Sequence, residues 1–109
     1  MTTDQIRGAM DLLYSQRAPG LPATALAEVF DRLIWCLADH GASLLQVRES
    51  WLKSDEKERV EIALAMNETY PFNDAREMEV VFGRISNRWP ELRARCAELQ
   101  EARAKEGSK

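Results

Sequence analysis

The chain has 109 residues, of which 45% are hydrophobic and 30% are charged, and its formal net charge is −3. The length suits a single domain, and this balance of apolar and charged residues excludes a disordered chain. The acidic net charge disfavours binding to nucleic acid or to anionic lipid.

The first predicted helix begins near Thr3 and ends before the break at residues 18–22. Thr2 and Gln5 have the spacing of a capping box, in which the two residues satisfy each other's backbone N–H groups. The sequence Ala-Pro-Gly-Leu-Pro that follows is the strongest break in the chain, because proline and glycine both interrupt helices.

A second helix is predicted from Pro22 to His40, because proline suits the first helical position and Gly41 is a typical stop signal. The apolar side chains of this helix follow its clearest periodic stripe. The stripe consists of Leu26, Val29, Phe30, Leu33, Ile34 and Leu37.

The next segment divides near Ser54 into two further helices. The first begins at Ser43, which has capping-box spacing to Gln46, and we expect the Arg48 guanidinium on it to reach water. The second covers about residues 55–68, and its apolar residues span about 200° of arc, which is broader than a surface helix needs. We therefore expect this second helix to be the central element.

Two helices complete the predicted fold. Asn73 or Asp74 caps a helix that runs to about Trp89, and Pro90 opens the last one. No segment alternates apolar and polar residues as a strand does. The sequence thus predicts an all-α fold, a compact bundle of five to six short helices in one domain over residues 1–103, followed by a disordered polar tail at 104–109.

The expected setting is the cytoplasm of a bacterium or of a virus that infects one. The N-terminus lacks the basic and apolar regions of a signal peptide, and no apolar stretch reaches the roughly 20 residues that a bilayer crossing needs. Cys36 and Cys96 both fall in helical patterns, which is typical of reduced thiols in a core.

The residues that carry chemistry form no recognisable site. His40 is the single histidine, four residues after Cys36, but a histidine in the last turn of a helix has a simpler explanation in the helix dipole. One histidine and two distant cysteines do not make a zinc site, and the glycines are isolated rather than grouped in a phosphate loop. We expect no catalytic residue, no cofactor and no metal.

Trp35 is the first candidate for binding a partner. It points about 160° away from the centre of the apolar stripe of its own helix, toward an acidic face that contains Glu28, Asp31 and Asp39. Tryptophan is enriched among the residues that dominate protein interfaces. The alternative is that another helix of the chain covers Trp35.

The helix at 74–89 carries a second candidate face. Val80 points away from the apolar stripe there, beside Arg76 and Gly83, and a glycine inside a helix costs about 1 kcal/mol relative to alanine. Such a glycine either permits close approach of another helix or is simply tolerated at the surface. Arg84 and Arg88 extend this face.

These observations favour a small intracellular protein-binding domain, such as an inhibitor, an immunity-type protein, an adaptor or an accessory subunit. Its partner would be another protein, a basic one in view of the acidic surface. One alternative is a helical regulator that binds DNA through a basic cluster, although Glu91 and Glu98 interrupt that cluster; it consists of Arg84, Arg88, Arg93 and Arg95. A second alternative is a homodimer with one of the two candidate helices at its two-fold axis.

Overall fold

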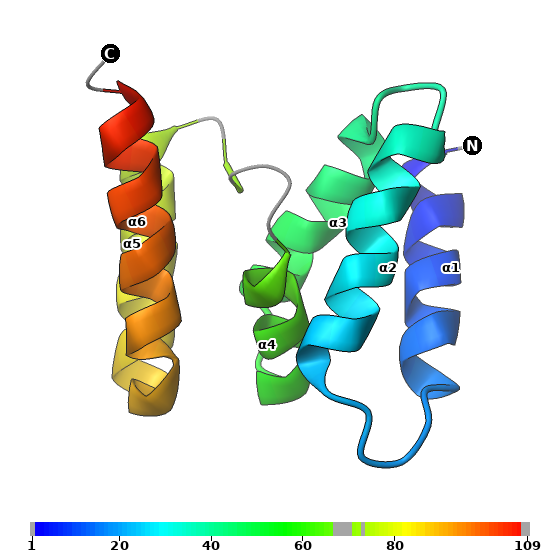
Figure 1. The fold of residues 1–109 in the computed structure, drawn as a ribbon, viewed down its shortest axis with the longest axis horizontal. Coiled ribbons are helices and arrows are strands. Elements are labelled where there is room, and N and C mark those ends of the chain that lie inside the picture. The colour runs from blue at the N-terminus through cyan, green and yellow to red at the C-terminus, as the bar shows by residue number, and fades with distance from the viewer. Residues whose placement is uncertain (1, 67–70, 73, 108–109) are drawn as a thin grey trace. The chain divides into compact units, whose positions relative to one another are not determined.

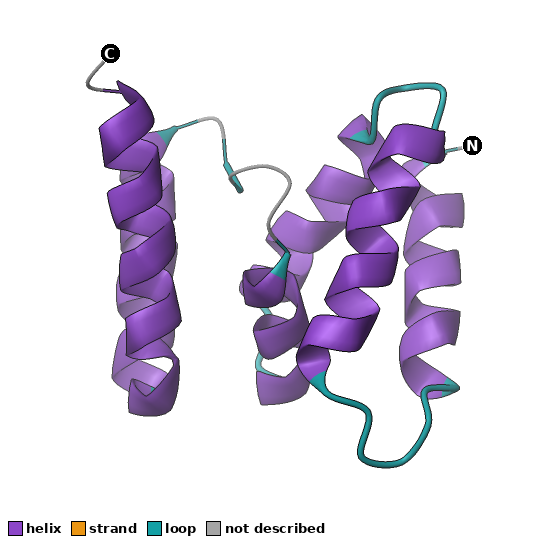
Figure 2. Cartoon of the chain, viewed as in Figure 1, coloured by secondary structure: helices purple, strands orange, loops and turns teal. Residues whose placement is uncertain are grey.

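A computed structural model describes residues 2–66, 71–72 and 74–107 (Figure 1). These residues form six α-helices and one short 3-10 helix, and none of them is in a strand (Figure 2). The predicted all-α fold class is confirmed. The chain divides into two compact units, Met1–Glu68 and Thr69–Lys109, where the sequence predicted one domain.

The first unit contains α1 (Thr3–Ser15), α2 (Ala23–Cys36), α3 (Ala42–Leu52) and α4 (Lys57–Ala65). The capping box predicted at the start of α1 is confirmed. The Gln5 backbone N–H donates to the Thr2 hydroxyl over 3.2 Å, and the Thr2 N–H donates to the Gln5 side chain over 2.8 Å. The predicted division near Ser54 is also confirmed, since α3 and α4 are separate helices.

Helix α2 is shorter at both ends than the sequence predicted. Pro22 precedes it as the N-cap, and the helix ends at Cys36 rather than His40. His40 and Gly41 instead adopt left-handed backbone conformations, with φ of 57° and 84°. A Cβ atom on Gly41 would lie 2.7 Å from Ile34 Cγ2, so the turn after α2 closes tightly enough to require glycine.

Helix α4 contacts both α2 and α3, while α1 contacts α3. The prediction that α4 is the central element is wrong, because α3 contacts all three other helices of the first unit. Trp51 anchors the aromatic part of this core, with edge-to-face contacts at 5.6 Å to both Phe30 and Tyr14. The core of the unit is formed by Ile6, Met10, Leu26, Ala27, Phe30, Ile34, Leu44, Val47, Trp51, Leu52, Val60, Ile62, Ala63, Leu64 and Met66.

Two apolar positions, Val29 in the predicted stripe of α2 and Leu13 on the apolar face that the helical spacing predicts for α1, are exposed instead of buried. Val29 on α2 is 44% exposed, and Leu13 on α1 is also at the surface. Both lie at the edge of their stripes, where the helical angle alone does not determine whether a neighbouring helix covers the side chain.

The prediction for Arg48 is wrong. Its side chain is 0% exposed, and its guanidinium donates to the backbone carbonyls of Ala63 and Met66 over 2.8 Å each. These carbonyls belong to the end of α4, which carries the negative pole of the helix dipole. The buried charge is therefore held by the helix end rather than by water.

The predicted limits of α4 change as well. The helix starts at Lys57 rather than Asp55, and it ends at Ala65 with Met66 as its C-cap. The remainder of the predicted 55–68 segment, residues 67 and 68, lies outside the described residues.

The second unit contains α5 (Ala75–Arg88), η1 (Pro90–Leu92) and α6 (Arg93–Gly107). The Asp74 side chain caps α5 by accepting from the Arg76 N–H over 2.9 Å, whereas the alternative cap, Asn73, lies outside the described residues. Helix α6 continues to Gly107, past residue 104 where the sequence predicted a polar tail. The buried side chains of α5 and α6 are Met78, Phe82, Ile85, Cys96 and Leu99.

No helix in the described part of the chain combines the length and the apolar character that a membrane crossing requires.

Candidate functional site

Trp35 lies on the outer surface of α2, and 70% of its side chain is exposed. No described helix of the first unit therefore covers Trp35. Three other exposed side chains of α2 are Val29, Arg32 and Cys36. Together with Glu28 these residues form what we call the Trp35 surface.

Of the three acidic residues predicted around Trp35, Glu28 and Asp39 are exposed and Asp31 is buried. Glu28 is exposed, but its carboxylate pairs with Arg32 over 3.2 Å, one helical turn away. Asp31 is only 8% exposed and belongs to the buried side of α2. Asp31 is therefore not available to a partner. The prediction failed here because the buried arc of α2 is wider than its apolar stripe.

Asp39 holds the turn between α2 and α3 together. Its carboxylate accepts from the Gly41 N–H over 2.9 Å, and from the Ser43 N–H and hydroxyl over 3.1 and 2.7 Å. These bonds, first of all the one from the Ser43 hydroxyl, lower the pKa of Asp39. The capping box predicted from Ser43 to Gln46 is replaced by this arrangement, and Gln46 instead accepts from the Thr3 hydroxyl over 3.1 Å.

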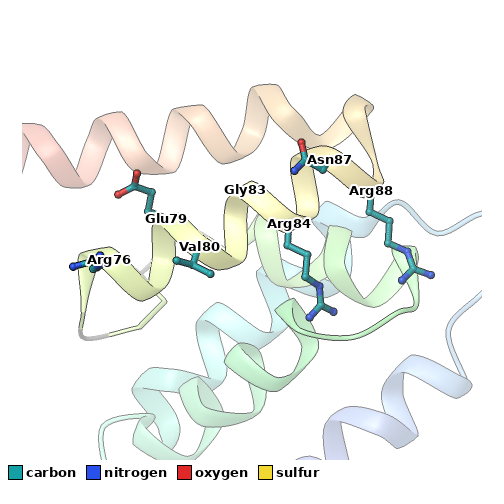
Figure 3. A pocket seen from close by; sticks show the side chains of 7 residues that line it. All are labelled: Arg76, Glu79, Val80, Gly83, Arg84, Asn87 and Arg88. Atoms are coloured by element: carbon teal, nitrogen blue, oxygen red, sulfur yellow. The ribbon is translucent and has the colours of Figure 1, made fainter.

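The second candidate face lies on α5 and brings together all five predicted residues. Arg76, Val80, Gly83, Arg84 and Arg88 line one shallow hollow, and Val80 is 67% exposed. Figure 3 shows Val80 between Glu79, which projects from one edge of α5, and Arg84, which projects from the other. The sequence analysis did not include Glu79 in this face, and Asn87 also lines it. We call this the α5 surface.

The basic cluster proposed for nucleic acid is divided between two helices. Arg84 and Arg88 belong to α5, and the Arg88 guanidinium lies 4.9 Å from the centre of the Trp89 ring. Arg93 and Arg95 belong to α6, where Arg95 forms an ion pair with Glu98 at 3.0 Å. Acidic side chains thus accompany this cluster in space as they do in sequence.

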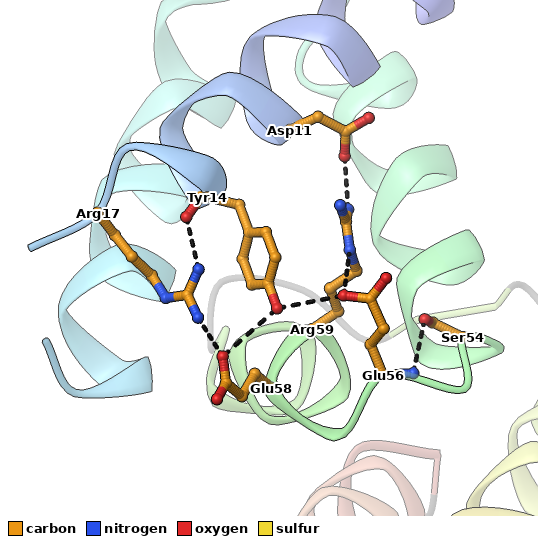
Figure 4. Close-up of polar contacts among 7 residues, drawn as sticks. All are labelled: Asp11, Tyr14, Arg17, Ser54, Glu56, Glu58 and Arg59. Carbon is orange, nitrogen blue, oxygen red and sulfur yellow. Dashed lines mark hydrogen bonds and ion pairs between the residues drawn. The ribbon is translucent and has the colours of Figure 1, made fainter. Parts of the chain in front are cut away.

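A polar network joins α1 to the start of α4, and the sequence analysis missed it (Figure 4). Arg59 pairs with Asp11 at 2.5 Å and with Glu56 at 3.2 Å, and it lies over the Tyr14 ring at 4.4 Å. Burial is the largest single influence on Arg59 and lowers its pKa, but the hydrogen bonds to Asp11 and Glu56 and the charges of these carboxylates together outweigh burial and raise the pKa. Arg17 completes the network by pairing with Glu58.

The two cysteines have different environments. Cys96 is buried as predicted, and burial raises the pKa of its thiol. Cys36 is exposed, so the prediction of a core position is wrong for it, because Cys36 follows Trp35 on the outer side of α2. Among the described residues, no three histidine, cysteine, aspartate or glutamate side chains are grouped so that they could hold a metal ion.

The sequence matches no protein-family profile, and no curated protein or solved structure is significantly similar to it.

Proposed function

We propose that this protein is a small protein-binding domain that acts by surface contact through the Trp35 surface and carries out no chemistry of its own. The observation that carries the proposal is the 70% exposure of Trp35. Removing a tryptophan of this size from water releases a large amount of binding free energy, and such residues are the usual centres of protein interfaces. An inhibitor, immunity-type protein, adaptor or accessory subunit would act in this way.

The charge of the first unit favours a basic partner. Residues 1–68 contain eleven Asp and Glu against seven Lys and Arg, a net charge of −4, whereas residues 69–109 have a net charge of +1. The acidic charge thus belongs to the unit that carries Trp35. A field of this sign accelerates association with a basic protein, even though Glu28 beside Trp35 is already paired.

The proposal places the protein in the cytoplasm. Cys36 is an exposed free thiol next to Trp35, and exposed thiols persist in reducing compartments.

The experiment that tests the proposal compares Trp35→Ala with a matched control, Leu12→Ala. Leu12 lies on α1 and is 61% exposed, so both changes remove an exposed apolar side chain of the first unit. We expect affinity capture from native cytosol to yield a partner protein that binds equally well to the wild type and to Leu12→Ala. For that partner, Trp35→Ala should weaken binding by more than about 1 kcal/mol, measured by calorimetry.

The thermal stability of the two variants serves as the control for folding. Since both side chains are exposed, each substitution should change the free energy of unfolding by no more than about 0.5 kcal/mol. A partner that binds wild type and Trp35→Ala with the same affinity would contradict the assignment of the Trp35 surface.

A further inference from the structure

The α5 surface has the residue spacing of one strand of a coiled coil, with Val80 as the apolar member of its core line. Arg76, Val80, Gly83 and Asn87 follow one another at intervals of four, three and four residues, which is the spacing of the two core positions in a heptad. Glu79 and Arg84 flank this line on opposite edges of the helix (Figure 3). They occupy the two positions that border the core line of a heptad.

We propose that the α5 surface binds a second copy of this chain, with the two α5 helices parallel and in register about a two-fold axis. With Val80 and Gly83 at the core positions a and d, Glu79 is at position g and Arg84 is at the following position e. In a parallel pair of helices a g residue lies next to the e residue five positions later on the other helix. Each Glu79 therefore faces the partner's Arg84. The two-fold axis repeats the contact, so one surface supplies two ion pairs.

Glu79 and Arg84 are not spaced to pair with each other along α5. Ion pairs within a helix form between residues three or four positions apart, and these two residues are five positions apart. Their opposite charges therefore meet only when a second helix is present.

The centre of the surface permits close approach of two helices. A Cβ atom on Gly83 would have no atom within 4 Å, so the backbone of a second helix can lie close to it. Val80 would lose its 67% exposure there. An asparagine at a core position, here Asn87, specifies the register of the two helices and favours a dimer over larger assemblies. Because the pattern spans only the 14 residues of α5, we expect the association to be weak.

A second copy fits this surface better than nucleic acid does. Residues 69–109 contain eight basic and seven acidic residues, so the unit has almost no field to attract phosphate. Glu79 lies within the surface and would repel a phosphate group, whereas in the dimer it meets an arginine.

The experiment uses the full chain and two charge reversals, Glu79→Arg and Arg84→Glu, with sedimentation equilibrium as the measurement. Each reversal replaces both ion pairs of the dimer by like-charge contacts, and each should raise the dissociation constant about ten-fold. When the two variants are mixed, one contributes two arginines and the other two glutamates, so both contacts between positions 79 and 84 are again attractive. The mixture should associate as strongly as the wild type. If either variant failed to fold, mixing would not restore association, so this experiment separates lost ion pairs from lost folding.

The controls are Glu101→Arg and Arg93→Glu, which make the same charge changes at exposed positions of α6. Neither should alter the dissociation constant, and Trp35→Ala should leave it unchanged too, so this proposal and the proposed function fail separately.

Three results would overturn the proposal. The first is a species of 12.4 kDa at every concentration, and the second is a mixture that associates no more than the single variants. The third is salt-dependent binding of duplex DNA that Arg84→Glu abolishes, which would assign the surface to nucleic acid.

Discussion

Arg48 shows how a single buried charge can be part of a stable core. The guanidinium is completely removed from solvent, yet it donates to two carbonyl oxygens at the end of α4. The last turn of a helix leaves its carbonyls without N–H donors from the helix itself, and the Arg48 guanidinium supplies donors at this end of α4. Arg48 thus supplies hydrogen-bond donors to the carbonyl groups at the end of α4, a helix that comes later in the sequence.

We predict that Arg48→Leu lowers the free energy of unfolding by about 2–4 kcal/mol, because leucine leaves both buried carbonyls without a donor. Urea denaturation would measure the change. Arg32→Leu is the matched control, since Arg32 is exposed and pairs only at the surface with Glu28, and it should cost less than about 1 kcal/mol. An equal loss in the two variants would mean that Arg48 contributes nothing through its buried bonds.

For single residues, the sequence predicted correctly those features that depend on residues nearby in the chain. The capping box of Thr2 and Gln5 is set by spacing and was correct. The burial of Arg48 and of Asp31 was not predicted, because a helical wheel gives the direction of a side chain but not what covers it. The direction of Trp35 on its helix was sufficient to identify it, since no described helix of the first unit covers that side of α2.

At the scale of the helix, the turn between α2 and α3 shows how a side chain outside a helix can determine where the next one begins. The sequence suggested that Ser43 caps α3, but Asp39 performs that role from the preceding loop. The loop can reach back because His40 and Gly41 reverse the chain in left-handed conformations. Nothing in the local spacing of Ser43 and Gln46 predicts such a path.

Asp39→Ala should therefore lower the melting temperature without weakening the binding of a partner through Trp35. The pKa of Asp39 is lowered in the folded state, so its contribution is present above the ordinary pKa of 3.8 and is lost as the pH falls through the lower, folded value. Thermal denaturation as a function of pH would measure this. The difference between wild type and variant should disappear at the acid end of the series, and a constant difference would exclude the ionised carboxylate as its cause.

At the scale of the whole molecule, the helix count was predictable and the division into two units was not. Apolar periodicity and the prolines at 22, 71 and 90 mark where helices begin and end, and these signals are local. Which helices contact one another depends on packing between segments far apart in the sequence. Five of the six helices ended within a few residues of the prediction, but α6 extended through a segment whose polarity suggested a tail.

Because the chain divides into two units, a destabilising substitution in one unit should change the hydrogen exchange of amides in that unit only. Arg48 bonds within the first unit, so Arg48→Leu should accelerate the exchange of protected amides in α1 to α4 and leave those of α5 and α6 unchanged. Mass spectrometry of peptide fragments would measure both sets in one sample. Equal acceleration in all helices would show one cooperative domain, as the sequence predicted.

The exposure of Trp35 also makes the protein its own optical probe. Of the three tryptophans, Trp51 is buried and Trp89 is partly covered, so Trp35 is the one whose indole ring has most contact with water. Water-soluble quenchers should reach Trp35 first, and its emission should shift to the blue when another surface displaces water from the ring. The encounter with a partner can thus be followed by intrinsic fluorescence, without a label on either molecule.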